Sequence, residues 1–388
     1  MILPAKKPGL TLANRWRISD GGIIFSGVLF FLTLGWISPP SGWESSTLQS
    51  LASGPDDWNR YARHALEIHR NGLLMPGAPC PYDGPGGFLY AYFLAACAAG
   101  GWNNSGDFYL LQSALLGLSW GLWTSASRIF FRSPWLWGLF AVSLAVVFFL
   151  DVYRHYVFRL LSENLFLPLQ AVWFYSWIQG SNAADHGKIE RYFWPSISCI
   201  AATWMALVRP QLILFPWLFL VGSIGFYRYR GEVKKSVFWS FAVFITATEM
   251  FLCFRNFWVC GVPSCLPEEG MSYALSQGWR QSGGFFQKLA FIMGWLPALA
   301  PEYHIRPHWL LAWAGILGGG TWSGLKRRVS LSHFGMGLLF ILYYGATLFW
   351  VELPSYGFRY ILPLMPLLWI YLFIVLQSWV CPSQVTHR

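Results

Sequence analysis

Apolar segments about as long as a membrane-spanning helix recur along the whole of this 388-residue chain. A helix needs about 20 mostly apolar residues to cross the hydrocarbon core of a bilayer. Charged residues make up only 11% of the chain, whereas soluble domains contain about 25%. The sequence therefore predicts an all-α polytopic membrane protein, organised as a single transmembrane domain over residues 1–388.

About ten of these segments have the length and composition of membrane spans. They are residues 21–37, 108–127, 134–150, 164–179, 193–208, 210–227, 237–257, 307–324, 331–351 and 360–380. No small-residue cleavage site follows the first segment, so we expect a retained span rather than a removed signal peptide.

The basic residues indicate how these spans are oriented, because Lys and Arg concentrate in cytoplasmic loops. With the N-terminus in the cytoplasm, sixteen of the 27 Lys and Arg residues and four of the 17 acidic residues lie inside. The other eleven basic and thirteen acidic residues lie outside or in the outer halves of spans. We therefore expect both termini in the cytoplasm, the plasma (inner) membrane as the location, and an external active site.

The first external loop, residues 38–106, contains two segments that do not fit as spans. In residues 57–70, apolar side chains recur at helical spacing on one face and charged side chains occupy the other. This pattern is typical of a helix that lies in the membrane interface. Residues 88–100 are apolar but too short to cross a bilayer comfortably, so we expect a second surface helix.

A second long external loop is expected over residues 258–306. Its apolar stretch, residues 285–300, includes a glycine and a proline and predicts a re-entrant or surface helix. Cys260 and Cys265 lie in the same loop. They can pair if the loop faces an oxidising compartment, or remain two free thiols.

Asp56 and Asp57 open the first predicted surface helix. An acidic residue at a helix N-terminus commonly caps free backbone N–H groups and interacts favourably with the helix dipole. The same position on a helix along the membrane also suits a carboxylate directed at a substrate that arrives from the lipid. A cap and a catalytic carboxylate are both consistent with these residues.

A dense polar run, residues 151–164, joins the third and fourth predicted spans on the external side. It contains His155 and Arg159 and ends with Glu163 and Asn164 at the mouth of the fourth span. A solvated loop has a similar composition, but ionisable groups at membrane depth are costly and commonly functional. We therefore interpret this run as part of a site.

Arginines stand next to prolines at two further external span ends. Arg209 precedes Pro210 between the fifth and sixth spans, and Arg359 opens the last span together with Tyr356 and Tyr360. Such an arginine can extend to the interface. Its planar guanidinium can also bind a lipid phosphate.

Two more ionisable residues, Glu249 and Arg255, lie in the outer part of the predicted span 237–257. Charged residues inside a membrane span are costly unless they are paired. We expect these two to pair along the helix, with a catalytic role as the alternative.

The order of these clusters resembles that of the membrane-embedded glycosyltransferases of the GT-C superfamily, such as mannosyltransferases and aminoarabinose transferases. Five short motifs carry the resemblance: residues 56–65 (DDWNRYARHA), 82–88 (YDGPGGF), 161–164 (LSEN), 207–210 (LVRP) and 357–360 (GFRY). These enzymes take sugars from polyprenyl-phosphate or polyprenyl-diphosphate donors. Two surface helices after the first span are also typical of them.

By position, the resemblance implies that Asp57 or Asp56 acts as the catalytic base or positions the acceptor. It implies that Glu163 assists catalysis and helps to bind a divalent cation (Mg or Mn) in members that use one. The chain lacks the full acidic triplet of metal-dependent members. The residues expected to bind the donor phosphate are Arg359, Arg209 and Arg159, and those expected to bind substrate are Tyr61, His155, Tyr356 and Tyr360.

The predicted function is therefore transfer of a hexosyl or pentosyl group from a polyprenyl-phosphate sugar to a glycan, lipid or protein acceptor on the periplasmic or lumenal face. Membrane lipids are the other expected partners. The net charge of +10 does not indicate nucleic-acid binding, since the basic residues lie in short loops where they set topology.

Three other functions are compatible with a polytopic chain of this kind. A lipid-linked glycan polymerase or ligase also uses external arginines, but does not need the acidic pair before two surface helices. A transporter or flippase favours inverted repeats and polar sites at the midplane, and no clear repeat is visible in the sequence. A non-enzymatic subunit of a larger complex is the third alternative.

Overall fold

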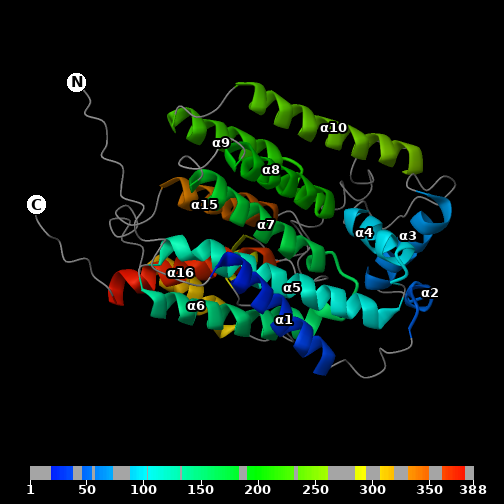
Figure 1. Ribbon diagram of the computed structural model, residues 1–388, viewed down its shortest axis with the longest axis horizontal. Coiled ribbons are helices and arrows are strands. Elements are labelled where there is room, and N and C mark those ends of the chain that lie inside the picture. Colours follow the sequence, from blue (N-terminus) through cyan, green and yellow to red (C-terminus); the bar gives the residue numbers. More distant parts are fainter. Residues whose placement is uncertain are drawn as a thin grey trace, which may run out of the picture.

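The structure, a computed structural model, describes residues 19–37, 46–54, 57–72, 88–102, 104–131, 133–182, 190–230, 235–260, 285–293, 306–318, 331–348 and 361–380. Within these ranges the chain is almost entirely helical, and an isolated β-bridge joins Thr47 to Asn104. The all-α prediction is confirmed. Figure 1 shows the long helices running alongside one another, roughly along one axis.

The elements follow in chain order as α1 (Asp20–Ile37), α2 (Leu48–Leu51), α3 (Asp57–Asn71), α4 (Phe88–Ala99), α5 (Ser105–Ser127), η2 (Arg128–Phe130), α6 (Pro134–Val147), η3 (Phe148–Val157), α7 (Glu163–Asn182), α8 (Glu190–Val208), η5 (Pro210–Leu212), α9 (Phe215–Arg230), α10 (Lys235–Cys260), α12 (Phe285–Ile292), α13 (Pro307–Gly318), α15 (Leu331–Leu348), η8 (Leu362–Leu364) and α16 (Met365–Val380). Three of the η elements, η2, η5 and η8, are 3₁₀-helices, whereas η3 is a π-helix that continues α6. Each segment predicted as a span or surface helix overlaps one of these helices.

Three described helical segments are long and apolar enough to cross a membrane. They are α1, Pro134–Val157 (α6 with η3) and Val237–Arg255 within α10. Shorter apolar helices cover Leu89–Ala99, Tyr192–Val208, Phe215–Phe226, Gly335–Leu348 and Leu362–Gln377. These segments give the protein the character of a membrane protein, while the number of crossings and their direction stay predictions.

Glycines bring α1 and α5 into backbone contact. A Cβ atom added at Gly27 would lie 2.6 Å from the carbonyl oxygen of Gly117, and one at Gly121 would lie 2.6 Å from the Cα atom of Ile24. Gly117 and Gly121 are four residues apart and therefore lie on one face of α5. This small-residue spacing is a common way for membrane helices to approach closely.

Helix α7 lies in the middle of the bundle, packed against α5 and α8 and touching α15 and η8 (Figure 1). Its Trp173 is fully buried and meets the rings of Phe215 and Phe340. The side chain of Gln170 donates a 2.6 Å hydrogen bond to the carbonyl oxygen of Pro363, just before α16. The last helix is thereby tied to the central one.

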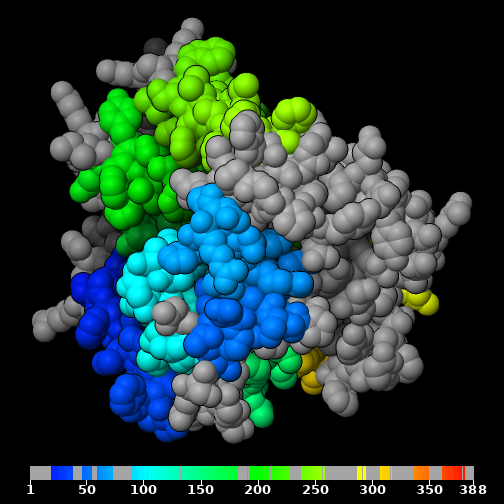
Figure 2. Space-filling model, turned by 90° about the vertical axis from the view of Figure 1, so that its right-hand side faces the viewer, coloured from blue at the N-terminus to red at the C-terminus, as the bar shows by residue number. Residues whose placement is uncertain are grey.

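The first-loop helices α2, α3 and α4 form a second small core at one end of the bundle (Figure 1). The sequence predicted that the apolar face of α3 lies in the membrane interface. Instead, Tyr61, Ala62, Ala65 and Ile68 are buried against α2 and α4. Figure 2, viewed from this end, shows α3 in blue on the surface of the molecule. The apolar face is covered by protein, and the charged face points outward.

The segment predicted as a re-entrant or surface helix at residues 285–300 is helical over Phe285–Ile292. Its Ile292 joins the main core, and the carbonyl oxygen of Ile292 accepts a hydrogen bond from the Trp313 indole of α13. Phe286 on the opposite side is exposed. The glycine and proline of this stretch, Gly294 and Pro297, lie outside the described residues.

Candidate functional site

The carboxylate of Glu163 and the guanidinium of Arg209 form a buried ion pair at the centre of the candidate site. Nη2 of Arg209 lies 2.5 Å from Oε1 of Glu163, and Nη1 donates a 2.6 Å hydrogen bond to the hydroxyl of Tyr344. The guanidinium also lies over the ring of Phe166, 5.2 Å from its centre. Ser162 contacts the other carboxylate oxygen at 3.4 Å.

Local sequence explains how the two charges reach this position. Glu163 is the first residue of α7, where a negative charge interacts favourably with the helix dipole. Arg209 directly follows the end of α8, and Pro210 after it disfavours continuation of the helix. Both side chains are almost fully buried, at 2% and 4% exposure. A charge in such a place is costly unless it is paired.

Asn164, the next residue, links the bundle to the surface helices. Its amide nitrogen contacts the side-chain oxygen of Gln112 and donates to the carbonyl oxygens of Tyr156 (3.0 Å) and Arg159 (2.8 Å). The hydroxyl of Tyr90, on α4, donates to the same oxygen of Gln112 at 2.9 Å. One amide side chain thus joins α4, α5, the turn after η3 and α7.

The ring of Tyr61, predicted to bind substrate, packs edge-on against Tyr90 with 5.2 Å between ring centres. Burial raises the pKa of the Tyr90 phenol well above its ordinary value, and the nearby charge of Glu163 adds to this effect. The phenol therefore remains protonated and donates to Gln112. Tyr61 is 7% exposed, so its ring positions the surface helices against the Glu163 end of α7.

The start of the last helix approaches the same region. Pro363, four residues after Arg359 in the sequence, accepts the hydrogen bond from Gln170. Gln170 lies two turns after Glu163 on α7, about 10 Å along the helix axis. The described contacts thus link three predicted clusters, on α3, at the start of α7 and at the end of α8, and place η8 beside α7 two turns away.

The remaining predicted site residues divide into two groups. Arg159 and His155 are exposed on η3 and the turn after it, and Arg159 lies over the ring of Phe158 at 5.8 Å. Asp57 is the first residue of α3, but its side chain is outside the described part of the structure. Also outside the described residues are Asp56, Tyr356, Arg359 and Tyr360.

The predicted pairing of Glu249 with Arg255 is wrong. Both carboxylate oxygens of Glu249 accept from the indole nitrogen of Trp217 on α9, at 2.9 and 3.0 Å. Arg255 lies over the ring of Tyr92 on α4, 5.9 Å from its centre. The two residues are six positions apart, and that spacing places them on different faces of one helix.

A divalent cation at Glu163 was expected from the resemblance. The described carboxylate oxygens face Arg209 and Ser162. In the described part of the chain, no three His, Cys, Asp or Glu side chains gather as metal ligands. The cation therefore stays an expectation drawn from the resemblance, and the proposed reaction does not use one.

A second buried acid, Asp151 on η3, opens the polar run predicted as part of a site, but no individual role was assigned to it from the sequence. Its carboxylate is fully buried and contacts three donors around the start of α13: Arg306 at 3.1 Å, His308 at 2.7 Å and the indole of Trp309 at 3.4 Å. The donors follow it by more than 150 positions. No local motif connects them, so only the fold could reveal this cluster.

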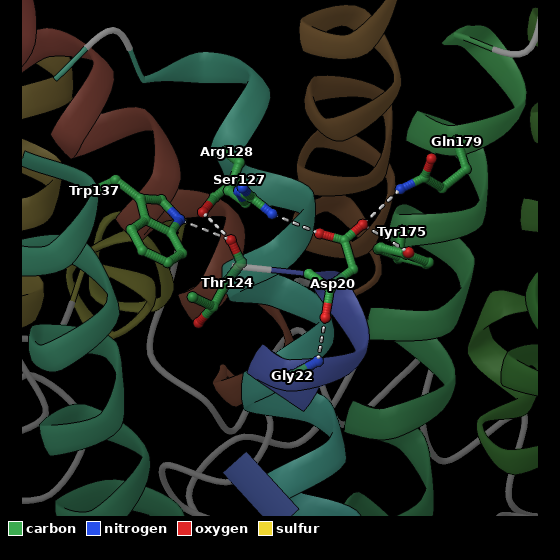
Figure 3. Close-up of polar contacts among 9 residues, drawn as sticks. Asp20, Gly22, Thr124, Ser127, Arg128, Trp137, Tyr175 and Gln179 are labelled. Carbon is green, nitrogen blue, oxygen red and sulfur yellow. Dashed lines mark hydrogen bonds and ion pairs between the residues drawn. The ribbon is translucent and has the colours of Figure 1, made fainter. Parts of the chain in front are cut away.

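Asp20 forms another polar cluster, at the opposite end of α7 (Figure 3). One oxygen pairs with Arg128 at 2.9 Å, and the other accepts from Tyr175 at 3.0 Å and Gln179 at 3.2 Å. The cluster joins the start of α1, the end of α5 and the second half of α7. Tyr175 and Gln179 follow Trp173 on α7, whereas Glu163 precedes it, so the cluster is separate from the candidate site.

Comparisons with protein-family models, with curated proteins and with solved structures find no match for this chain. The resemblance to the GT-C superfamily therefore remains an expectation drawn from the motifs.

Proposed function

We propose that this chain is an integral membrane glycosyltransferase that moves a sugar from a polyprenyl-phosphate donor to an acceptor outside the cytoplasm. The observation that carries the proposal is the buried Glu163–Arg209 pair together with the hydrogen bonds of the next residue, Asn164. These contacts lie where α4, on which α3 packs, meets α8 near the start of α7. They join two of the motifs, residues 161–164 and 207–210, and Tyr90 connects them to Tyr61 in a third, residues 56–65.

The chemistry needs a base for the acceptor hydroxyl and positive charge for the leaving lipid phosphate. In the proposed step, the acceptor oxygen bonds to the anomeric carbon and the bond from that carbon to the phosphate oxygen breaks. The acceptor proton passes to a carboxylate, for which Asp57 or Asp56 at the start of α3 is the candidate. Arg359 and Arg159 are the candidates for holding the phosphate as its charge develops.

The Glu163–Arg209 pair has a positioning role in this proposal. Arg209 was predicted to bind the donor phosphate, but its guanidinium lies against Glu163 and is 4% exposed. A buried arginine paired in this way fixes the end of α8 against the start of α7. The pair thereby holds the surface helices and the proposed base at a constant place relative to the bundle.

The proposed orientation follows from the basic loops. Both termini lie in the cytoplasm, α3 and α4 lie on the external side of the plasma membrane, and the donor's prenyl chain lies among the membrane lipids. The acceptor is a glycan, lipid or protein. Nucleic acid is not a partner in this proposal.

The test uses the purified full chain in lipid vesicles with a radiolabelled polyprenyl-phosphate sugar. We expect label to move to an acceptor and free polyprenyl phosphate to appear in equal amount. Asp57→Asn combined with Asp56→Asn, or Arg359→Gln alone, is expected to abolish transfer. Arg63→Gln, an exposed position on the charged face of α3, is the matched control and should retain activity.

The same experiment separates the alternative functions. A transporter or flippase would move the labelled lipid across the bilayer with the sugar still attached. A polymerase would convert it into a ladder of longer lipid-linked glycans. Unchanged transfer in both the aspartate double variant and Arg359→Gln would disprove the proposal.

A further inference from the structure

The outer end of the α6–η3 segment carries more positive charge than the described acids neutralise. Arg154 and Arg159 are exposed on η3 and the turn after it, and Arg306 approaches from the start of α13. Arg154 and Arg159 are five positions apart, and Arg306 pairs with Asp151 of the same η3 segment at 3.1 Å. The η3 basic cluster consists of these three arginines and His155.

The acidic residue of η3 itself is Asp151. Its carboxylate is fully buried and lies against Arg306 and His308. Of the three arginines in the cluster, Arg306 pairs with this aspartate, while Arg154 and Arg159 are exposed. Among the described residues, neither Arg154 nor Arg159 forms an ion pair.

The backbone that presents this charge is unusual. The segment Phe148–Val157 is a π-helix of 10 residues. Such geometry is rare and occurs mostly as single turns, frequently at functional sites. Its buried side is held by Asp151, and by Tyr153, whose hydroxyl bonds to that of Tyr109 on α5. Arg154 and Arg159 are therefore exposed on a segment whose buried side is held in place by the contacts of Asp151 and Tyr153.

We infer that the η3 basic cluster binds a phosphate-class anion, a phosphomonoester or a diphosphate, at the membrane surface. Like charges that are held close together repel unless an anion lies among them. The planar guanidinium groups of Arg154 and Arg159 match the oxygens of a phosphate. Arg306 is steadied by its ion pair with Asp151 at 3.1 Å, so it adds a positioned third charge.

This site differs from the one predicted from the sequence, which assigned phosphate binding to Arg209 and Arg359 together with Arg159. Arg209 lies against Glu163 and is 4% exposed, whereas Arg154, to which no phosphate was assigned from the sequence, is exposed like Arg159. The inference deepens the proposed function, in which Arg159 holds the donor phosphate, but it can fail separately, because anion binding by the cluster does not require sugar transfer. The phosphate can be borne by a lipid or free in solution, and the experiment separates these sources.

The test compares the full chain with the double variant Arg154→Gln/Arg159→Gln. The matched control is Arg63→Gln/Arg70→Gln, which removes the same charge from exposed positions on α3. The first probe is inorganic diphosphate, titrated into the detergent-purified protein by calorimetry. The second is a phosphatidylcholine vesicle with or without phosphatidic acid, whose headgroup is a phosphomonoester. Circular dichroism verifies that the variants fold, and no sugar donor is present.

We expect the unmodified chain to bind at least one probe, with an affinity that falls as salt is raised. The η3 double variant should bind roughly tenfold more weakly or worse, and the α3 control should match the unmodified chain. Binding of phosphatidic acid alone identifies a lipid headgroup site, and binding of diphosphate as well identifies a site open to free phosphate. Equal affinity in the η3 variant, an equal loss in the control, or no binding of either probe overturns the inference.

Discussion

Glu163 and Arg209 approach to 2.5 Å although they lie at the ends of different helices and are separated by 46 positions in the sequence. Both side chains are almost completely shielded from solvent. The energetic cost of burying each charge is therefore offset mainly by the opposite charge of its partner. Removing one partner leaves the other as an isolated buried charge, which typically costs about 3–5 kcal/mol. This dependence gives a prediction about stability that does not require knowledge of the substrate.

We predict that Glu163→Gln lowers the free energy of unfolding by about 3–5 kcal/mol, because the Arg209 charge then lacks its carboxylate. The measurement is thermal or denaturant unfolding of the purified protein in detergent. The double variant Glu163→Leu/Arg209→Met removes both charges and should recover most of the stability. A single variant as stable as the unmodified chain would contradict the buried pair.

A second prediction concerns the amide of Asn164, which donates to the backbone carbonyls of Tyr156 and Arg159. Asn164→Asp has the same shape but cannot donate from its side chain, and it places a new carboxylate next to Glu163. We expect a loss of about 2–4 kcal/mol, since buried carbonyls lose partners and like charges meet. His155→Gln, at an exposed position on η3, is the control and should change stability by less than about 0.5 kcal/mol.

The contact between α1 and α5 predicts opposite outcomes for two glycines. Gly117 faces the backbone of Gly27, whereas nothing lies within 4 Å of the position that a Cβ atom at Gly138 would occupy. Gly117→Ala should destabilise the protein by about 1–3 kcal/mol through overpacking. Gly138→Ala, within α6, should be neutral or stabilising by up to about 1 kcal/mol, because alanine favours the helix. Similar unfolding midpoints for the two variants would argue against the close helix contact.

Asp20 is expected to contribute to stability without affecting transfer. Its contacts with Arg128, Tyr175 and Gln179 (Figure 3) join three helices, yet its side chain is 31% exposed. Partly exposed ion pairs typically contribute up to about 1 kcal/mol. Asp20→Asn should therefore lower the unfolding free energy by about 1 kcal/mol and leave the rate of sugar transfer unchanged. A loss of transfer in a fully folded variant would place Asp20 in the functional machinery.

The positions of the helices could be predicted from the sequence because apolar runs are local signals. The described helix α5 (Ser105–Ser127) matches the predicted segment 108–127, and α4 (Phe88–Ala99) matches 88–100. Amphipathicity also predicted α3 correctly as a helix. It did not reveal that α4, rather than lipid, covers Tyr61 and Ala65, since the spacing of apolar residues along a helix does not identify what packs against them.

The candidate site was only partly predictable, because its contacts join residues far apart in the chain. Glu163 and Arg209 were identified separately as polar residues at span ends, but not as a pair. Gln112 and Tyr90 were missed, since single polar residues within apolar helices carry no local pattern. The partners of Asp151 lie around the start of α13. Such connections depend on which helices become neighbours, and that information is not local.

The final prediction tests the orientation on which the proposed external site depends. Arg63 is exposed on α3, which the charge distribution places outside the membrane, and Lys234 precedes α10 in a basic loop predicted to lie inside. In intact cells, Arg63→Cys should react with a membrane-impermeant maleimide, whereas Lys234→Cys should react only after permeabilisation. Labelling is read as a mass shift of the purified protein, with the unmodified chain as the measure of background from its own cysteines. The reverse pattern would place the basic side chains of α3 in the cytoplasm. A donor exposed on the external leaflet could then not reach the proposed base at the start of α3, and the proposed reaction would have to take place on the other side.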